Sequence, residues 1–392
     1  MPINYHQVQK QMPFFCERAT DHHRAAQSAA RQLLDALATF GRQIDELITL
    51  IAAEAKGDKS LRCARPVREA PTSVYHLPDK IDSVMLIAAD GSQINPSRHR
   101  QVDFGLINVA TICMRTGVDA APTFETESTL LDDYDLYAGN SPLTEDLIAL
   151  ERDLRERAAL YNQSRKYPAP VITLTDGPLE LFREIGETAR FEKKLNEYIE
   201  ILAACQQANT VTAGYVDIPH SDLVNRMLRL AIGKAAVMDN ARRDELEHIR
   251  VPDASLFSSL LPSPGDRSAV FGIQSPWSKN FKGGLELCFF YLNVSRSEES
   301  CLARVELPAW CAGTPQLLDK LHAAIFRQCE IMGTRPYPYI LHRAHEIAVV
   351  TYEETTQIEN MLAAEMHEHG LETGAKSNKQ SAKELPGRGR YL

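Results

Sequence analysis

The chain has 392 residues, of which 44% are hydrophobic and 24% are charged, and its formal net charge is −9. This composition is typical of a globular protein with a sizeable core, and the acidic balance excludes a nucleic-acid coat protein, which would be basic throughout. The sequence has no apolar run long enough to span a membrane, no signal-peptide pattern and no C-x-x-C pair. We therefore predict a cytoplasmic protein with reduced cysteines.

The first predicted element is a helix over residues 21–55, whose apolar residues recur at alternating intervals of four and three. They are Leu33, Leu37, Phe40, Ile44, Leu47 and Ile51. This stripe fits a helix, or a two-helix arm, that packs on its own domain, and it also fits a contact between two copies. Residues 1–20 show no clear pattern, and prolines within 57–80 indicate a connection. We predict an N-terminal helical arm and linker over residues 1–80.

Two apolar strands later in the chain end in the same way. The strand over 84–89 is followed by Asp90 and a glycine, and the strand over 170–175 is followed by Asp176 and a glycine. Two neighbouring carboxylates repel each other unless a cation lies between them, and a divalent metal is the usual one. A lone Asp-Gly pair is more often a turn, but its repetition after two apolar strands favours a pair of metal ligands.

The remaining elements alternate between strands and helices. A hairpin is predicted around residues 104–117, an acidic and turn-rich segment at 118–140, and a loop-rich segment with short helices at 236–282. Further helices are predicted at 141–164, 190–208, 221–232, 315–332 and 342–364, and further strands at 210–216, 285–294 and 301–307. The order predicts an α/β fold with a mixed sheet flanked by helices over residues 81–370. Residues 371–392 form a basic tail, which we expect to be disordered and either solvated or bound to phosphate or a partner.

Hydrolysis of a phosphodiester needs an ionised water and a neutralised transition state, and two hard cations provide both. Such cations need three or four carboxylate or imidazole ligands from different elements. The helix over 141–164 offers Glu156 or Glu151, which cannot both face one point because they are five residues apart, and we favour Glu156. His345 is a fourth candidate, with Glu346 as its fallback. A helical glutamate is usually only solvated and a histidine is often a hydrogen-bonded core residue, so both are weaker candidates than the aspartates.

Nucleotide-binding and hydrolase motifs are absent from the sequence. There is no G-x-x-x-x-G-K-[ST] phosphate loop, no G-x-G-x-x-G after a strand and no G-x-S-x-G elbow. If the protein acts processively on DNA, the motor must therefore be another protein.

Several short segments together resemble the NurA nuclease family in their order and spacing. They are Asp90-Gly91-Ser92-Gln93-Ile94, Arg152-x-x-x-Glu156, Leu174-Thr175-Asp176-Gly177-Pro178-Leu179, Ala213-Gly214-Tyr215-Val216-Asp217 with Ser221-Asp222-Leu223-Val224, Arg304-Val305-Glu306-Leu307-Pro308-Ala309-Trp310, and Tyr337-Pro338-Tyr339-Ile340-Leu341 with Ala344-His345-Glu346. The resemblance covers residues 80–365.

The resemblance implies a ribonuclease-H-like core and DNA cleavage that depends on two manganese or magnesium ions per site. It also implies 5′-to-3′ exonuclease and single-strand endonuclease activities, a ring-like homodimer, and a partnership with a hexameric HerA translocase in DNA repair or phage defence. It matches Asp90, Glu156 and Asp176 to metal-binding acids, and His345 to a late position that is an acid or a histidine. Asp217 stands where many members have lysine, so no basic DNA contact is predicted there.

Two other functions fit the same residues. The chain could be a non-catalytic subunit that docks a ring ATPase through its long helix and basic tail. It could also be a metal-dependent phosphatase or ribonuclease, which would share the site and differ only in substrate.

Overall fold

The computed structural model describes residues 3–78, 83–97, 99–132, 137–138, 141–142, 145–181, 189–235, 249–296 and 300–374. The chain folds into two compact units. The first unit comprises Met1–Asp82, Gly177–Leu179 and Val211–Pro338, and the second comprises Ser83–Asp176, Glu180–Thr210 and Tyr339–Leu392. All four residues of the predicted site belong to the second unit.

The sheet of the second unit has the strand order β8-β3-β4-β5. Its strands are β3 (Met85–Ile94), β4 (Gly105–Arg115), β5 (Thr123–Leu131) and β8 (Val171–Asp176). The first three form an antiparallel meander, and β8 pairs parallel to β3 after the crossover helix α4 (Glu145–Ser164). Three antiparallel strands followed by a helix and a strand parallel to the first is the ribonuclease-H-like order. The predicted fold class is therefore confirmed.

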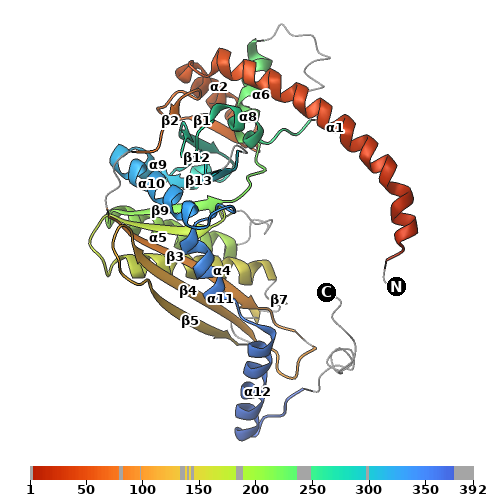
Figure 1. Cartoon of the computed structure of the whole chain (residues 1–392). Helices are drawn as coiled ribbons and strands as arrows, with labels where there is room; N and C mark the ends of the chain where they lie inside the picture. The colour runs from red at the N-terminus through yellow and green to blue at the C-terminus, as the bar shows by residue number, and fades with distance from the viewer. Residues whose placement is uncertain are drawn as a thin grey trace. The chain divides into compact units, whose positions relative to one another are not determined.

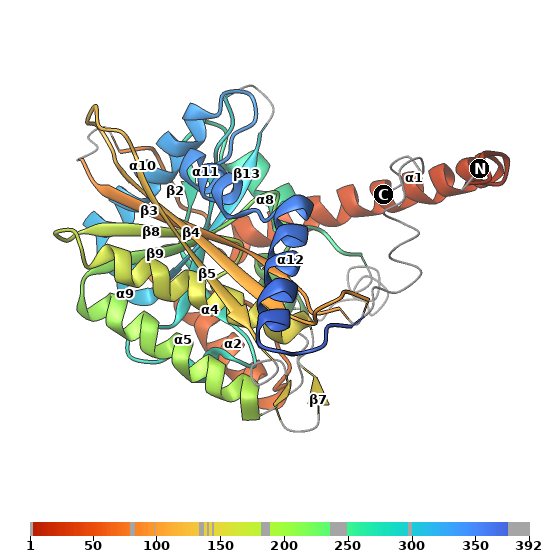
Figure 2. The same ribbon diagram turned by 90° about the horizontal axis from the view of Figure 1, so that it is seen from below.

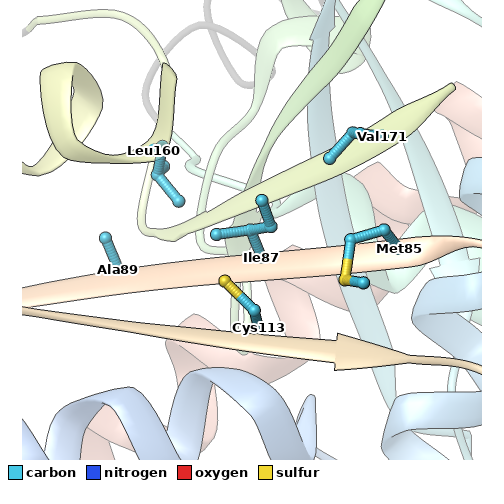
Figure 3. Packing of buried hydrophobic residues seen from close by; sticks show 6 residues of the cluster. All are labelled: Met85, Ile87, Ala89, Cys113, Leu160 and Val171. Atoms are coloured by element: carbon cyan, nitrogen blue, oxygen red, sulfur yellow. The ribbon is translucent and has the colours of Figure 1, made fainter. Parts of the chain in front are cut away.

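Helices cover both faces of this sheet (Figures 1 and 2). Side chains alternate along β3, and Met85, Ile87 and Ala89 pack with Leu160 of α4 on one face (Figure 3). Helix α5 (Ala189–Gln207) packs against α4, and α11 (Tyr339–Ala348) packs on the opposite face of β3 and β4. The sheet is thus a middle layer between two helical layers.

The single helix predicted over 342–364 is wrong, because the chain forms two helices there. After α11 the chain breaks, and α12 (Tyr352–Glu368) begins with Thr351 as its N-cap. The Thr351 side chain accepts from the backbone N–H of Glu354, and the Glu354 side chain accepts from the backbone N–H of Thr351. This capping box starts a new helix, which packs on the β3–β4 end of the sheet through Ile358 and Leu362.

The acidic segment at 118–140 was predicted to be turns, but it contains β5. Nine consecutive residues of β5 pair with β4 from Gly105↔Leu131 to Cys113↔Thr123. Most of its side chains are exposed, so its glutamates stay in water while its backbone bonds to β4. A short two-stranded sheet of β6 (Tyr137–Ala138) and β7 (Ser141–Pro142) follows.

The first unit has a largely antiparallel sheet. Its main strands follow the order β1 (Cys63–Pro66), β11 (Phe271–Gln274), β12 (Leu287–Asn293), β13 (Leu302–Pro308) and β9 (Thr210–Val216). The short strand β10 (Arg267–Ser268) joins β12 to β2 (Val74–Tyr75). Its helical elements are α1 (Tyr5–Phe40), α2 (Ile44–Gly57), α6 (Leu223–Ala235), α8 (Asp253–Leu260), the 3-10 turn η1 (Ser278–Asn280), α9 (Ala309–Ala312) and α10 (Pro315–Ile331).

The predicted helical arm is present as two helices, and it starts earlier than its pattern indicated. Residues 5–20, which showed no clear pattern, belong to α1. The arm breaks at Gly41, where a Cβ would lie 2.4 Å from the Leu37 carbonyl oxygen. The segment at 57–80 was predicted as a connection but supplies β1 and β2. The domain boundaries at residues 80 and 370 stay predictions, and the basic residues of the tail lie outside the described residues.

No helix among the described residues has both the length and the apolar character that crossing a bilayer requires.

Candidate active site

Strand β3 presents Asp90 and Gly91 to opposite faces of the sheet. Because Ala89 faces α4, Asp90 faces α11 and Gly91 faces α4. The two helices therefore reach the same point of the strand from its two sides.

On the α11 face, Asp90 is paired with His345. The His345 Nδ1 lies 2.7 Å from the Asp90 Oδ2, and the Asp90 Oδ1 accepts a hydrogen bond of 2.9 Å from the backbone N–H of Gly91. The Asp90 side chain is 19% exposed and the His345 side chain 66% exposed. The carboxylate is thus held in place and shielded, while the imidazole remains open to a ligand.

The end of α11 is fastened to the sheet by two polar side chains that sequence reasoning missed. Ser92 Oγ donates to the Ala348 carbonyl and accepts from the Val350 N–H at 3.2 Å. Asn108 Nδ2 donates to the same carbonyl at 2.8 Å. Both residues lie in apolar strands, where a buried polar side chain needs a partner, and this is the only signal in the sequence that marks Asn108. Ser92 also belongs to the Asp90–Ile94 segment that resembles the NurA family, but no role was predicted for it. They hold the helix turn that carries His345 over Asp90.

On the α4 face, Glu156 is buried beside Gly91. Its side chain is 7% exposed, and its Oε1 lies 3.3 Å from the Nε of Arg152, one helical turn earlier. Burial raises the pKa of Glu156 to about 8, and the charges of Asp153 and Asp90 act in the same direction, against the opposing charges of Arg157 and Arg152. A cation that bound here would favour the ionised form.

Gly91 is what lets Glu156 come this close to the strand. A Cβ at residue 91 would lie 2.7 Å from the Glu156 Oε1 and 2.8 Å from the Arg152 Cγ. The glycine of the Asp-Gly pair is therefore needed for a close approach and does not form a turn, since β3 continues to Ile94.

Asp176 ends the neighbouring strand. The parallel register pairs Ala89 with Thr175, so the next step along both strands brings Asp176 beside Asp90. By alternation both aspartates belong to the α11 face, and Asp176 is exposed. The strand stops there because Gly177 takes a φ of 85°.

The two fallback residues are engaged elsewhere. Glu151 lies 3.0 Å from the Nε of Arg155 and 2.8 Å from the Nζ of Lys194 on α5. Burial acts to raise the pKa of Glu151, but the hydrogen bond and charge of Lys194, together with the charge of Arg155, lower it. Glu346 pairs with Arg343 within α11.

The donor types fit a hard divalent cation, which prefers carboxylate oxygens and accepts imidazole. Two features of the second unit support such an ion: the buried Glu156 carboxyl, and the Asp90–His345 pair on the opposite side of the same strand position. Among the described residues, however, no three His, Cys, Asp or Glu side chains already form a ready-made metal cluster. The four-residue site thus stays a prediction, with Asp90 and His345 in contact and Glu156 adjacent to them across the strand.

A comparison with protein families gives one decisive match. The model of the NurA domain matches residues 85–350, which is more than half of the chain. The chain belongs to the NurA domain family. This is the nuclease family that the sequence motifs predicted, and the match contains every residue of the predicted site.

Solved structures show weaker likenesses. The NurA nuclease from Sulfolobus solfataricus aligns over 86% of this chain and 98% of its own, with 11% identity and a TM-score of 0.49. The catalytic domain of human Endonuclease V aligns over 81% and 97%, with 12% identity and a TM-score of 0.33. Ciona intestinalis Endonuclease V with DNA aligns over 70% and 87%, with 11% identity and a TM-score of 0.32. Likenesses at this level say nothing of substrate or activity, and no curated protein matches the NurA chain in sequence.

Proposed function

We propose that this NurA family protein is a metal-dependent deoxyribonuclease with 5′-to-3′ exonuclease and single-strand endonuclease activities. Family membership supports the hydrolysis of DNA. The observation that carries the proposal is the convergence of Asp90, His345 and Glu156 on one position of strand β3.

Asp90, Asp176 and Glu156 would hold two manganese or magnesium ions. Such ions lower the pKa of water and neutralise the charge that develops on the phosphate. Asp90 and Asp176 follow paired strand residues, so backbone hydrogen bonds fix their spacing. Glu156 is buried, so it can bind without the rotamer entropy cost of an exposed side chain.

His345 is placed to handle a proton. When its Nδ1–H donates to the ionised Asp90, the neutral ring leaves Nε2 as an acceptor. That nitrogen would take a proton from the attacking water or bind a second ion. Asp90 fixes the tautomer, as a carboxylate does for many catalytic and metal-binding histidines.

We propose that a HerA-type hexameric translocase feeds DNA to this site. The sequence has no phosphate loop of its own, so processive action needs a separate motor. We also propose that the chain acts as a homodimer and serves in DNA-end processing during repair or in phage defence. These points are supported by the family resemblance.

Mutation of Asp90 tests the catalytic proposal. With manganese and labelled single-stranded DNA, Asp90→Ala should lower the cleavage rate more than about 100-fold, because a proposed metal ligand and the partner of His345 are both lost. EDTA should abolish cleavage by the wild type, and added manganese should restore it.

Glu151→Gln is the matched control on the same helix as Glu156. Glu151 is paired with Lys194, so this variant should keep wild-type cleavage. An Asp90→Ala protein that cleaves at the wild-type rate would overturn the proposed site. A folded wild type that cleaves no DNA in manganese, alone or with a HerA-type ATPase, would favour a non-catalytic docking subunit.

A further inference from the structure

The first half of helix α1 is covered by nothing among the described residues. Residues 3–24 are all exposed, whereas Ala29, Leu33, Ala36 and Leu37 are buried in the first unit. The buried half packs on α6 and α8. In Figure 1 the exposed half of α1 (red) continues well beyond these two helices.

The exposed half carries large apolar side chains at regular intervals. Tyr5, Val8, Met12 and Phe15 are 68%, 43%, 54% and 73% exposed. Their spacing of three, four and three residues is that of a coiled-coil seam. The same spacing continues through Ala19, His22 and Ala26 to the buried Ala29, Leu33 and Ala36. One seam therefore runs the length of α1, and within the part of the chain that the structure describes only its second half is packed against other residues.

Such a helix is not stable alone in water. Isolated helices gain too little from their own hydrogen bonds unless they are long and rich in alanine, and most helices in proteins are stabilised by packing of an apolar face. The exposed half of α1 also contains Pro13, which removes one helix hydrogen bond. A bound partner would supply the missing packing.

We propose that residues 5–22 of α1 pair with the same residues of a second copy as an antiparallel two-helix coiled coil. In this arrangement Met12 faces Phe15 of the second copy, Val8 faces Ala19 and Tyr5 faces His22. The inference deepens the proposed homodimer, on which it rests, by naming the surface, and it makes no use of the nuclease site.

The charge pattern favours a second copy and the antiparallel direction. Lys10, Glu17 and Arg24 lie on the outer face, away from the seam, so identical helices do not repel each other there. Arg18 flanks the seam and meets Gln11 of an antiparallel partner. In a parallel pair Arg18 would instead meet His23, and His22 would meet His22.

Two neighbouring phenylalanines provide a matched test. Phe15 lies in the seam, whereas Phe14, which is 63% exposed, lies outside it. In sedimentation equilibrium of the full chain, the wild type should be a dimer, and Phe15→Glu should raise its dissociation constant by roughly 100-fold or more, since each dimer loses two buried aromatic rings. Phe14→Glu should dissociate like the wild type.

A wild type that stays monomeric at about 100 μM, a Phe15→Glu protein that stays dimeric, or an equal loss in Phe14→Glu would each overturn the proposed surface. Circular dichroism confirms that the variants are folded. Because sedimentation reads assembly and not cleavage, a failure of the nuclease proposal would leave this result unchanged.

Cysteine cross-linking tests the direction of the pair. In a Cys16→Ser background, Met12→Cys and Phe15→Cys chains are oxidised separately and as a mixture. An antiparallel pair should give cross-linked dimers in the mixture only. Cross-linking of Met12→Cys chains alone would overturn the antiparallel register, and no cross-link in any sample would overturn the coiled coil.

Discussion

Gly91 shows how one missing side chain shapes the site. Glu156 is a buried acid whose ionised form is costly, so its carboxyl can serve the proposed cation only if it reaches the position on β3 where Asp90 lies. The absence of a Cβ at residue 91 leaves the room that this approach needs. The glycine is thus part of the site although it has no chemistry of its own.

Gly91→Ala should therefore impair cleavage more than stability. The new methyl group would push the Glu156 carboxyl and the Arg152 stem away by several tenths of an ångström or more, and a displacement near 1 Å can cost about 100-fold in rate. Initial rates with manganese and single-stranded DNA give the measurement. Gly57→Ala is the control, because a Cβ added at residue 57 would meet nothing within 4 Å. This variant should cleave at the wild-type rate. Equal rates for both variants would show that the approach of Glu156 does not matter.

The parallel pairing of the two apolar runs could be predicted from local sequence, but the surroundings of their acids could not. Asp90 and Asp176 each follow a residue of the paired register, Ala89 and Thr175, although β3 continues past Asp90 to Ile94. The choice of Glu156 over Glu151 stays a prediction; in the structure Glu151 is paired with Lys194 of α5, a contact that the sequence does not reveal. Ser92 and Asn108 were missed because their partner, the Ala348 carbonyl, is more than 200 residues away in sequence.

At the scale of elements, the placement of α11 depends on hydrogen bonds between its last turn and the sheet. Ser92 bonds both the Ala348 carbonyl and the Val350 N–H, at the point where the chain leaves the helix. Ser128 on β5 orients Asn108 without contacting α11 itself, because its Oγ donates to the Asn108 Oδ1 at 2.7 Å.

Ser92→Ala should loosen α11 without unfolding the sheet. The substitution leaves the Val350 N–H without its partner, which should cost about 1–2 kcal/mol in the free energy of unfolding. Backbone amides of α11 should exchange with deuterium faster, and those of β3 should not. Ser128→Ala removes only the outer bond and should cost less. Unchanged exchange in α11 would mean that packing alone positions His345.

Helices and strands could be predicted where the local sequence pattern favoured the same structure as the contacts made with distant parts of the chain. The break between α11 and α12 was missed, although Thr351 and Glu354 form a capping box that the sequence displays. Strand β5 was missed for a different reason. Its acidic composition favours a loop, and only its pairing with β4, which no local pattern contains, makes it a strand.

At the scale of the whole molecule, stability should depend on pH through His322 in the first unit. This histidine is fully buried on α10, and its Nε2 lies 2.6 Å from the Gly265 carbonyl oxygen, to which it donates. Burial lowers the pKa of His322 to about 4, and the charge of Arg267 acts in the same direction. The folded state is therefore more stable with the neutral imidazole than with the protonated one.

Acid should destabilise the fold through this residue. The pKa of this histidine is 6.5 in the unfolded chain and about 4 in the fold, so the unfolded chain binds more protons between pH 6.5 and pH 4. The stability that the neutral ring contributes is therefore fully present above pH 6.5 and is lost as the pH falls to 4. The loss should be about 3 kcal/mol over this window. Buried acids such as Glu156, whose pKa is raised, have the opposite dependence on pH, so the His322 contribution is measured as a difference between wild type and His322→Gln. His322→Gln keeps a donor for Gly265. Urea unfolding at pH 7 and at pH 4.5 should show that the wild type loses more stability, or gains less, than His322→Gln over this interval; an identical change in both proteins would exclude His322.

The fold class followed from the order of helices and strands, but the division into two units did not. The chain leaves the first unit after Asp82 and returns to it at Gly177–Leu179 and again at Val211. Sequence patterns report which face of an element is apolar, not which other element covers it, so interleaved units are not visible in them.

Because His345 and Glu156 approach β3 from opposite faces, no single helix carries the proposed site. If the proposed site is correct, α11 and α4 must both be packed against the sheet for cleavage to occur. We then expect a ligand or partner protein that displaced either helix by a few ångströms to inhibit cleavage without contacting Asp90, Glu156 or His345. Inhibition could therefore act on either face of the sheet.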